Sequence, residues 1–177
     1  LAELYDETSS IEDRTVGAGA ISSALARQFA VGGFVGRASG RAFDARTAFA
    51  YPPYDLIRPD IPLLHEGDVD ARVRIRIREA EQSLDLIDRL LDELSEGPIQ
   101  TPLALRSGEG MALVEGFRGD ILVWLRLGQD GRVVRCHLRD PSWFQWPLLE
   151  AAIENNIVGD FPLCNKSFNC SYSGHDL

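Results

Sequence analysis

The most regular pattern of apolar positions lies between residues 73 and 94. Seven apolar side chains recur there at alternating steps of four and three residues, which makes a heptad stripe on one face of a helix. They are Val73, Ile77, Ala80, Leu84, Ile87, Leu91 and Leu94. The alternation of residues 72–78 would also fit a strand, but the unbroken stripe favours a long helix.

This helix has signals at both ends. Asp68 and Asp70 place negative charge at its N-terminus, where the helix dipole favours it, and Gly97-Pro98 follows its last turn. We expect the stripe to pack in the hydrophobic core. Replacement of Leu84 or Ile87 by alanine should then lower the free energy of unfolding by about 2 to 5 kcal/mol.

Past Pro102 the pattern changes to short β-type runs. These runs are 111–114, 121–127 and 132–138. The Gly-containing segment 128–131 predicts a hairpin turn between the last two, with Trp124 and His137 near each other across it. After the strands, Ser142 is the expected N-cap of a helix that runs toward Asn155.

The region before the long helix is rich in glycine and proline. Ser22 or Ser23 would cap a short helix over residues 24–29, and Gly32-Gly33 would end it. Residues 32–62 predict a long loop with little regular structure. Its aromatic side chains favour a functional or partner-contacting loop over a disordered tether.

Length and charge limit the classes of protein. The 177 residues are enough for one sizeable domain, and we expect a single domain over residues 1–177. The formal net charge is −9, which argues against a nucleic-acid surface built on phosphate neutralisation. No apolar run approaches the roughly 20 residues that cross a bilayer, and no secretory signal begins the chain. We therefore expect a cytoplasmic protein.

The three cysteines are Cys136, Cys164 and Cys170. They are too few and too irregularly spaced for a disulfide framework, and their odd number fits a reducing compartment. Free cysteine is among the most buried residue types, so we expect all three to be small, semi-buried core residues.

Several motifs occur in an order that resembles one protein superfamily. They lie at residues 13–17, 31–40, 43–46, 51–55, 67–72, 79–84, 96–98 and 115–120. In this order they resemble the superfamily of nickel-iron hydrogenase large subunits, formate hydrogenlyase large subunits and the catalytic-core subunit of respiratory complex I. The resemblance implies an α+β fold, mainly helical, with a long core helix and a small antiparallel β-sheet. It also implies the C-terminal portion of a longer large subunit.

The end of the chain departs from the metal-binding form of this family, which reads Asp-Pro-Cys-x-x-Cys. Aligning residues 167–169 with the family's Ser-Leu-Asp puts Ser171 and Gly174 at the two cysteine positions. In the alternative register Cys170 is the first ligand, and Ser173 takes the second position. Neither a hydroxyl nor a bare backbone replaces a thiolate on a soft metal. We therefore expect no metal ligand and no catalytic residue in this chain.

The resemblance implies a role in an electron-transfer complex. We expect a hydrogenase-like or NADH-quinone oxidoreductase large-subunit fragment that contributes cavity wall and subunit interface and is not active alone. A smaller partner subunit would carry an iron-sulfur cluster, quinone would bind in the parent complex, and this chain would bind no cofactor itself. It would lie peripherally at the cytoplasmic face of the membrane through its partners. The alternative is a redox-inactive scaffold or assembly module, and self-association through exposed apolar surface is a further expectation.

Six residues are candidates for lining the cavity or quinone pocket that the resemblance implies. They are Arg37, Glu115, Arg118, Ser171, Gly174 and His175. A carboxylate in a poorly solvated cavity can be tuned toward neutral pH, so Glu115 could relay protons or orient a quinone headgroup. A structural ion pair is the alternative for Glu115 and Arg118, and a solvated loop position is the alternative for Arg37. An acid-base pair of His175 and Asp176 is disfavoured because adjacent residues rarely face each other.

Overall fold

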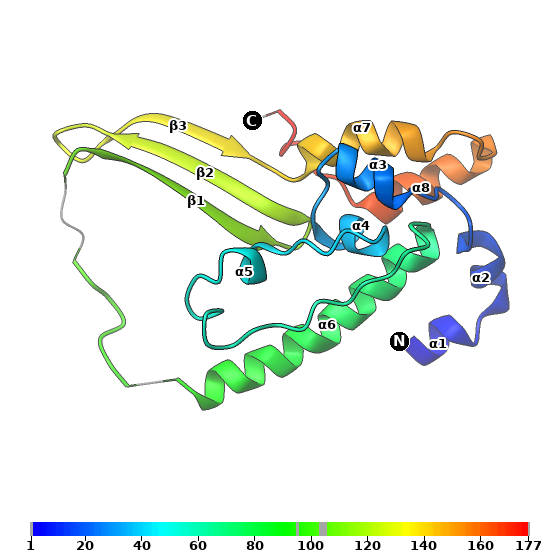
Figure 1. Cartoon of the computed structure of the whole chain (residues 1–177), viewed down its shortest axis with the longest axis horizontal. Helices are drawn as coiled ribbons and strands as arrows, with labels where there is room; N and C mark the ends of the chain where they lie inside the picture. The colour runs from blue at the N-terminus through cyan, green and yellow to red at the C-terminus, as the bar shows by residue number, and fades with distance from the viewer. Residues whose placement is uncertain (1, 95, 103–105, 177) are drawn as a thin grey trace.

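The computed structural model describes residues 2–94, 96–102 and 106–176. Short helices gather around the N-terminal half of one long helix, and a three-stranded sheet extends away from them (Figure 1). In chain order the elements are α1 (Ala2–Asp6), α2 (Ser9–Thr15), α3 (Ser23–Gln28), α4 (Gly33–Ala38), α5 (Ala45–Ala48), α6 (Val69–Asp92), β1 (Gly108–Gly116), β2 (Gly119–Leu127), β3 (Val133–Arg139), α7 (Ser142–Ala152), η1 (Val158–Asp160) and α8 (Phe161–Phe168). The predicted fold class is confirmed. No helix in the described ranges is long and apolar enough to cross a membrane.

The long helix α6 begins where the sequence predicts. The Asp68 carboxylate caps it by accepting hydrogen bonds from the backbone N–H groups of Ala71, at 2.8 Å, and Gly17, at 2.7 Å. The second bond fixes the preceding loop against the start of the helix. The helix ends at Asp92, two residues before the end of the apolar stripe.

The expected core position of the stripe is wrong for its C-terminal half. Leu84 is 65% exposed and Leu91 63%, whereas Ile75, which lies outside the stripe, is completely buried. The helix packs into the core through a neighbouring face at its N-terminal end, and its C-terminal half projects away from the other helices (Figure 1). A heptad pattern identifies an apolar face, but it does not say what covers that face.

Arg72 lies on the packed face of α6 and is fully buried. Its guanidinium donates to the carbonyl oxygens of Gly19, at 3.1 Å, and Gly67, at 2.6 Å, and to the Ser167 hydroxyl, at 2.9 Å. It also lies over the ring of Phe168. Burial lowers its pKa to about 10. Arg72 therefore connects α6, the loop before α3 and α8.

The expected loop over residues 32–62 contains two helices, α4 and α5. Gly33 begins α4 instead of ending the previous helix. Its φ is +63°, and a Cβ there would lie 2.1 Å from the carbonyl oxygen of Arg118. This glycine is thus required by the close approach of the β1–β2 turn, a reason that the local sequence does not show. The preceding helix is α3, and the predicted cap Ser22 accepts a hydrogen bond from the N–H of Leu25.

The sheet is antiparallel in the order β1-β2-β3. Trp124 and His137 are direct partners in its register, as predicted. The first strand begins at Gly108, earlier than the apolar run 111–114 suggested. Its pairing with β2 extends beyond that run, to the pair of Gly108 with Leu127.

Ser142 does not cap α7 as expected. It is the first residue of the helix, and its N–H donates to the Asp140 carboxylate at 2.8 Å. Its hydroxyl instead accepts a hydrogen bond from the N–H of Ser171 in the C-terminal segment. The helix ends at Ala152, short of the predicted Asn155, which has a φ of +63°.

The three cysteines differ in burial. Cys164 is buried and Cys170 is partly buried, but Cys136 is exposed, so the expectation of a core position is wrong for it. It lies on β3, an edge strand of the sheet whose side chains are mostly open to solvent.

Candidate functional site

Arg37 is the centre of a buried cluster of charges. Its side chain is 2% exposed and forms ion pairs with Glu79 on α6 at 2.5 Å, Glu115 on β1 at 2.9 Å and Asp44 before α5 at 3.3 Å. The alternative of a solvated loop arginine is therefore wrong. Arg46 adds a second cation by pairing with Asp44 at 2.7 Å. Four segments of the chain meet in this cluster.

Glu115 is held on both carboxylate oxygens. Oε1 accepts from Arg37, and Oε2 accepts from the backbone N–H of Ala45 at 2.9 Å. Burial raises the pKa of Glu115 above its ordinary value, although Arg37 and the Ala45 N–H act in the opposite direction. The backbone N–H of Glu115 donates to the hydroxyl of Tyr51. The geometry therefore fixes a carboxyl group that retains a proton more readily than one in water.

A cavity of about 310 Å³ lies beside this cluster. Arg37, Glu79 and Glu115 form part of its wall, together with Tyr54 and Phe117. The wall thus combines one carboxyl group with a raised pKa, that of Glu115, with aromatic surface. Arg37 and Glu115 are two of the six residues that the sequence indicated.

Arg118 lies in the turn between β1 and β2, three residues after Glu115. Its Nε donates to the backbone carbonyl of Asn169, and its own carbonyl accepts from Gln145 Nε2 at 2.8 Å. Within the described residues it forms no ion pair with Glu115, which pairs with Arg37 instead. Arg118 joins the turn to the C-terminal segment.

Ser171 and Gly174 lie together beside α7. The N–H of Gly174 donates to the Ser171 hydroxyl at 3.0 Å. The indole N–H groups of Trp143 and Trp146 donate to the carbonyl oxygens of Gly174, at 2.9 Å, and Ser171, at 3.4 Å. Both backbone and side-chain groups of this segment are therefore used to hold it in place. His175 is exposed.

The side-chain chemistry of this segment is limited. An added Cβ at Gly174 would lie 2.6 Å from Cγ of Asp140, so the position has no room for a side chain. The Cys170 thiol lies 3.8 Å from Gln145 Oε1, and burial raises its pKa to about 12. It is therefore protonated at neutral pH. Within the described ranges, no group of three or more His, Cys, Asp or Glu side chains could hold a metal ion.

Sequence reasoning missed Asp44 and Glu79, which complete the cluster around Arg37. A signal for Glu79 exists, because it lies seven residues after Arg72 and therefore on the packed face of α6. Asp44 precedes a four-residue helix that the sequence pattern does not reveal, and its side chain caps this helix through the N–H of Arg46.

Comparison with known proteins gives a consistent set of matches. The family model for the respiratory-chain NADH dehydrogenase 49 Kd subunit matches residues 1–105. Formate hydrogenlyase subunit 5 of Escherichia coli K12 is 33% identical, over 99% of this chain and 31% of that protein. An NADH-quinone oxidoreductase subunit of Syntrophobacter fumaroxidans is 38% identical, over 83% of this chain and 41% of that protein.

A solved structure has the same fold over nearly the whole chain. It is the membrane-bound sulfane sulfur reductase, an archaeal respiratory membrane complex, with a TM-score of 0.90 and 28% identity. The match covers 99% of this chain and 51% of the matched one. The chain thus spans about half, or less, of the length of the proteins that it matches.

Proposed function

The chain belongs to the family of the respiratory-chain NADH dehydrogenase 49 Kd subunit, and on this premise we propose that it is a large-subunit component of a hydrogenase-like or NADH-quinone-oxidoreductase-like complex. The names of its relatives, a formate hydrogenlyase subunit and a quinone oxidoreductase subunit, support this assignment. So does the fold shared with a chain of a respiratory membrane complex. In this proposal the chain is peripheral to the membrane and held there by other subunits.

The second part of the proposal is that this chain has no nickel-iron centre of its own. The residues at the two expected cysteine positions do not fit such a centre, because Ser171 provides a hydroxyl and Gly174 provides no side chain. Packing of Gly174 against Asp140 is the single observation that carries this argument, since a ligand side chain there would overlap with the carboxylate. The neighbouring Cys170 thiol is protonated and faces an amide oxygen.

In place of metal chemistry, we assign the chain a role as cavity wall and subunit interface. Glu115 holds or releases a proton beside the 310 Å³ cavity, and Arg37 keeps its carboxyl group oriented. Arg118 joins the β1–β2 turn, which follows Glu115 on β1, to the C-terminal segment. The electrons would come from an iron-sulfur cluster on a smaller partner subunit, and a quinone in the parent complex would be their acceptor.

A second candidate function is a redox-inactive scaffold or assembly module. The same observation favours it, because a chain whose ligand positions are filled by other contacts can remain as a structural part. Quinone turnover separates the two functions. A cavity wall in a working complex implies that Glu115→Gln lowers turnover while the subunits stay assembled, whereas a scaffold implies that turnover is unaffected.

The test is purification of the tagged chain from its source cells together with its partners. We expect a smaller subunit with the absorbance and electron paramagnetic resonance signals of an iron-sulfur cluster, and electron transfer to a quinone analogue. A chain that purifies alone, or with partners that contain no iron, would contradict the proposal.

A further inference from the structure

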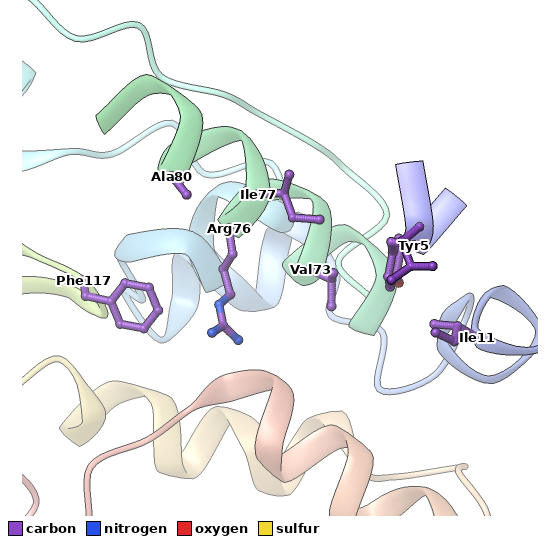
Figure 2. Close-up of a pocket in the computed structure, with 8 residues that line it drawn as sticks. Tyr5, Ile11, Val73, Arg76, Ile77, Ala80 and Phe117 are labelled. Atoms are coloured by element: carbon purple, nitrogen blue, oxygen red, sulfur yellow. The ribbon is translucent and has the colours of Figure 1, made fainter. Parts of the chain in front are cut away.

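An apolar groove of about 480 Å³ lies beside α6, on the side where α1 and α2 approach it (Figure 2). Its apolar lining consists of Leu4, Ile11, Val73, Ile77, Ala80 and Phe117. Val73, Ile77 and Ala80 are the first three members of the heptad stripe. The groove is therefore continuous along the helix with the remaining apolar residues of the stripe.

Those remaining residues have no cover within the described part of the chain. Leu84 is 65% exposed, Ile87 50% and Leu91 63%. We call this surface, from Val73 to Leu91 along the stripe, the α6 face. A contiguous apolar face of this kind marks an interaction site. Its alternating steps of four and three residues match the packing of one helix against another.

Arg76 gives the α6 face a specific charge requirement. Its guanidinium lies over the rings of Phe34, at 5.5 Å, and Phe117, at 5.3 Å, and points into the groove (Figure 2). Among the described residues it has no hydrogen-bonding or ionic partner. A cation that becomes covered by an apolar surface is costly unless a carboxylate pairs with it.

We propose that the α6 face binds an apolar helix that carries one carboxylate opposite Arg76. We assign this helix to the part of the family's large-subunit length that this chain does not span, since its relatives are two to three times as long as the matched region. The inference rests on family membership and not on the proposed loss of the metal centre, so either can fail without the other.

The experiment uses the chain as it is and two synthetic amphipathic helical peptides. Both peptides have leucine at the a and d heptad positions, and one residue at the centre of the apolar face is glutamate in the first and glutamine in the second. Fluorescence anisotropy measures their affinities. We expect the glutamate peptide to bind about tenfold more tightly, because close charge pairs at interfaces couple by at least this amount.

Three variants test which residues are responsible. In Arg76→Gln the two peptides should bind with affinities within about twofold of each other, since the charge that selects glutamate is gone. The double variant Leu84→Ser with Leu91→Ser should weaken both peptides by about tenfold, because the apolar contact is lost. Arg135→Gln is the matched control, because Arg135 also lies over an aromatic ring but on the sheet, and it should change neither affinity.

Several outcomes would overturn the inference. Absence of binding by either peptide would do so, as would equal affinity for the two peptides or no response to Arg76→Gln. Light scattering provides a further check on the occupant. A dimer that dissociates in the Leu84→Ser, Leu91→Ser variant would overturn it too, because the α6 face would then bind a second copy of the chain.

Discussion

Arg37 and Glu115 are 78 positions apart in the sequence and form a 2.9 Å ion pair in which their side chains are 2% and 4% exposed. The pair connects α4 to β1 and forms part of a cavity wall. Arg37 also faces Asp44 and Glu79, so it compensates three carboxylates, and Arg46 is a second cation for Asp44. The cluster can therefore serve a proton-holding role and also stabilise the fold.

The first prediction concerns the loss of this cation. Arg37→Met keeps much of the side-chain volume but leaves buried carboxylates without their partner, which should lower the free energy of unfolding by about 3 to 5 kcal/mol. Chemical denaturation measures the change. Arg126→Met is the control, since the Arg126–Glu109 pair is about half-exposed on both sides and should contribute less than about 1 kcal/mol. Equal effects of the two substitutions would contradict the structural role of the cluster.

The second prediction is a pH dependence that comes from Glu115. Folding raises the pKa of Glu115 above the usual 4.5 of the unfolded chain. At a pH between the unfolded-state pKa and the folded-state pKa, the folded protein therefore holds a proton that the unfolded chain has released. The free energy of unfolding therefore gains a contribution from Glu115 as the pH falls through this interval, and loses it as the pH rises. Glu115→Gln lacks this contribution. As the pH is lowered from neutral toward 4.5, the free energy of unfolding of the natural chain should rise relative to that of the variant. A difference between the two proteins that does not change with pH would refute the prediction.

The third prediction reverses an expectation from the sequence. Leu84→Ala and Ile87→Ala should each change the stability of the isolated chain by less than about 1 kcal/mol, because both side chains are at least half-exposed. Ile75→Ala on the same helix should cost about 2 to 5 kcal/mol, because Ile75 is completely buried. Thermal unfolding of the three variants measures this contrast. Large losses at Leu84 or Ile87 in the isolated chain would mean that the α6 face is already covered.

The fourth prediction concerns the contact between α4 and the β1–β2 turn. Gly33→Ala should destabilise the fold by more than about 3 kcal/mol, because the added Cβ would overlap with the Arg118 carbonyl and the backbone has a positive φ. Gly110→Ala is the control, since a Cβ there meets no atom within 4 Å. Circular dichroism during denaturation compares the two. A tolerated Gly33→Ala would show that this approach of the two segments is not required.

Elements with a regular pattern of their own were predictable from the sequence. The long helix α6, the negative charge of Asp68 at its start and the pairing of Trp124 with His137 follow from periodicity, helix-end signals and turn chemistry. The short helices α4 and α5 were not predictable, because glycine and proline signals dominate their region and tertiary packing determines their structure. Gly33 illustrates this, since its role depends on Arg118, which lies in the distant β1–β2 turn.

The candidate site was predictable only in part. Arg37 and Glu115 were indicated by a family resemblance, and the structure brings them together. Their partners were missed, although Glu79 lies seven residues after Arg72 on the packed face of α6 and could have been found from that spacing. Asp44 precedes a four-residue helix that the sequence pattern does not reveal. The exposure of the heptad stripe could not be predicted either. The spacing of apolar residues is the same on a helix face that packs in the core and on an apolar face that is exposed.

The nickel content of the chain decides most directly whether this large-subunit protein lacks a nickel-iron centre, as we propose. The chain is purified with its partners from cells grown with nickel, separated from them, and analysed by inductively coupled plasma mass spectrometry. A hydrogenase large subunit that ends in Asp-Pro-Cys-x-x-Cys, treated in parallel, is the positive control. We predict no nickel above background in this chain while the control retains it. About one nickel per chain, bound in the presence of Ser171 and Gly174, would show that the centre is present after all.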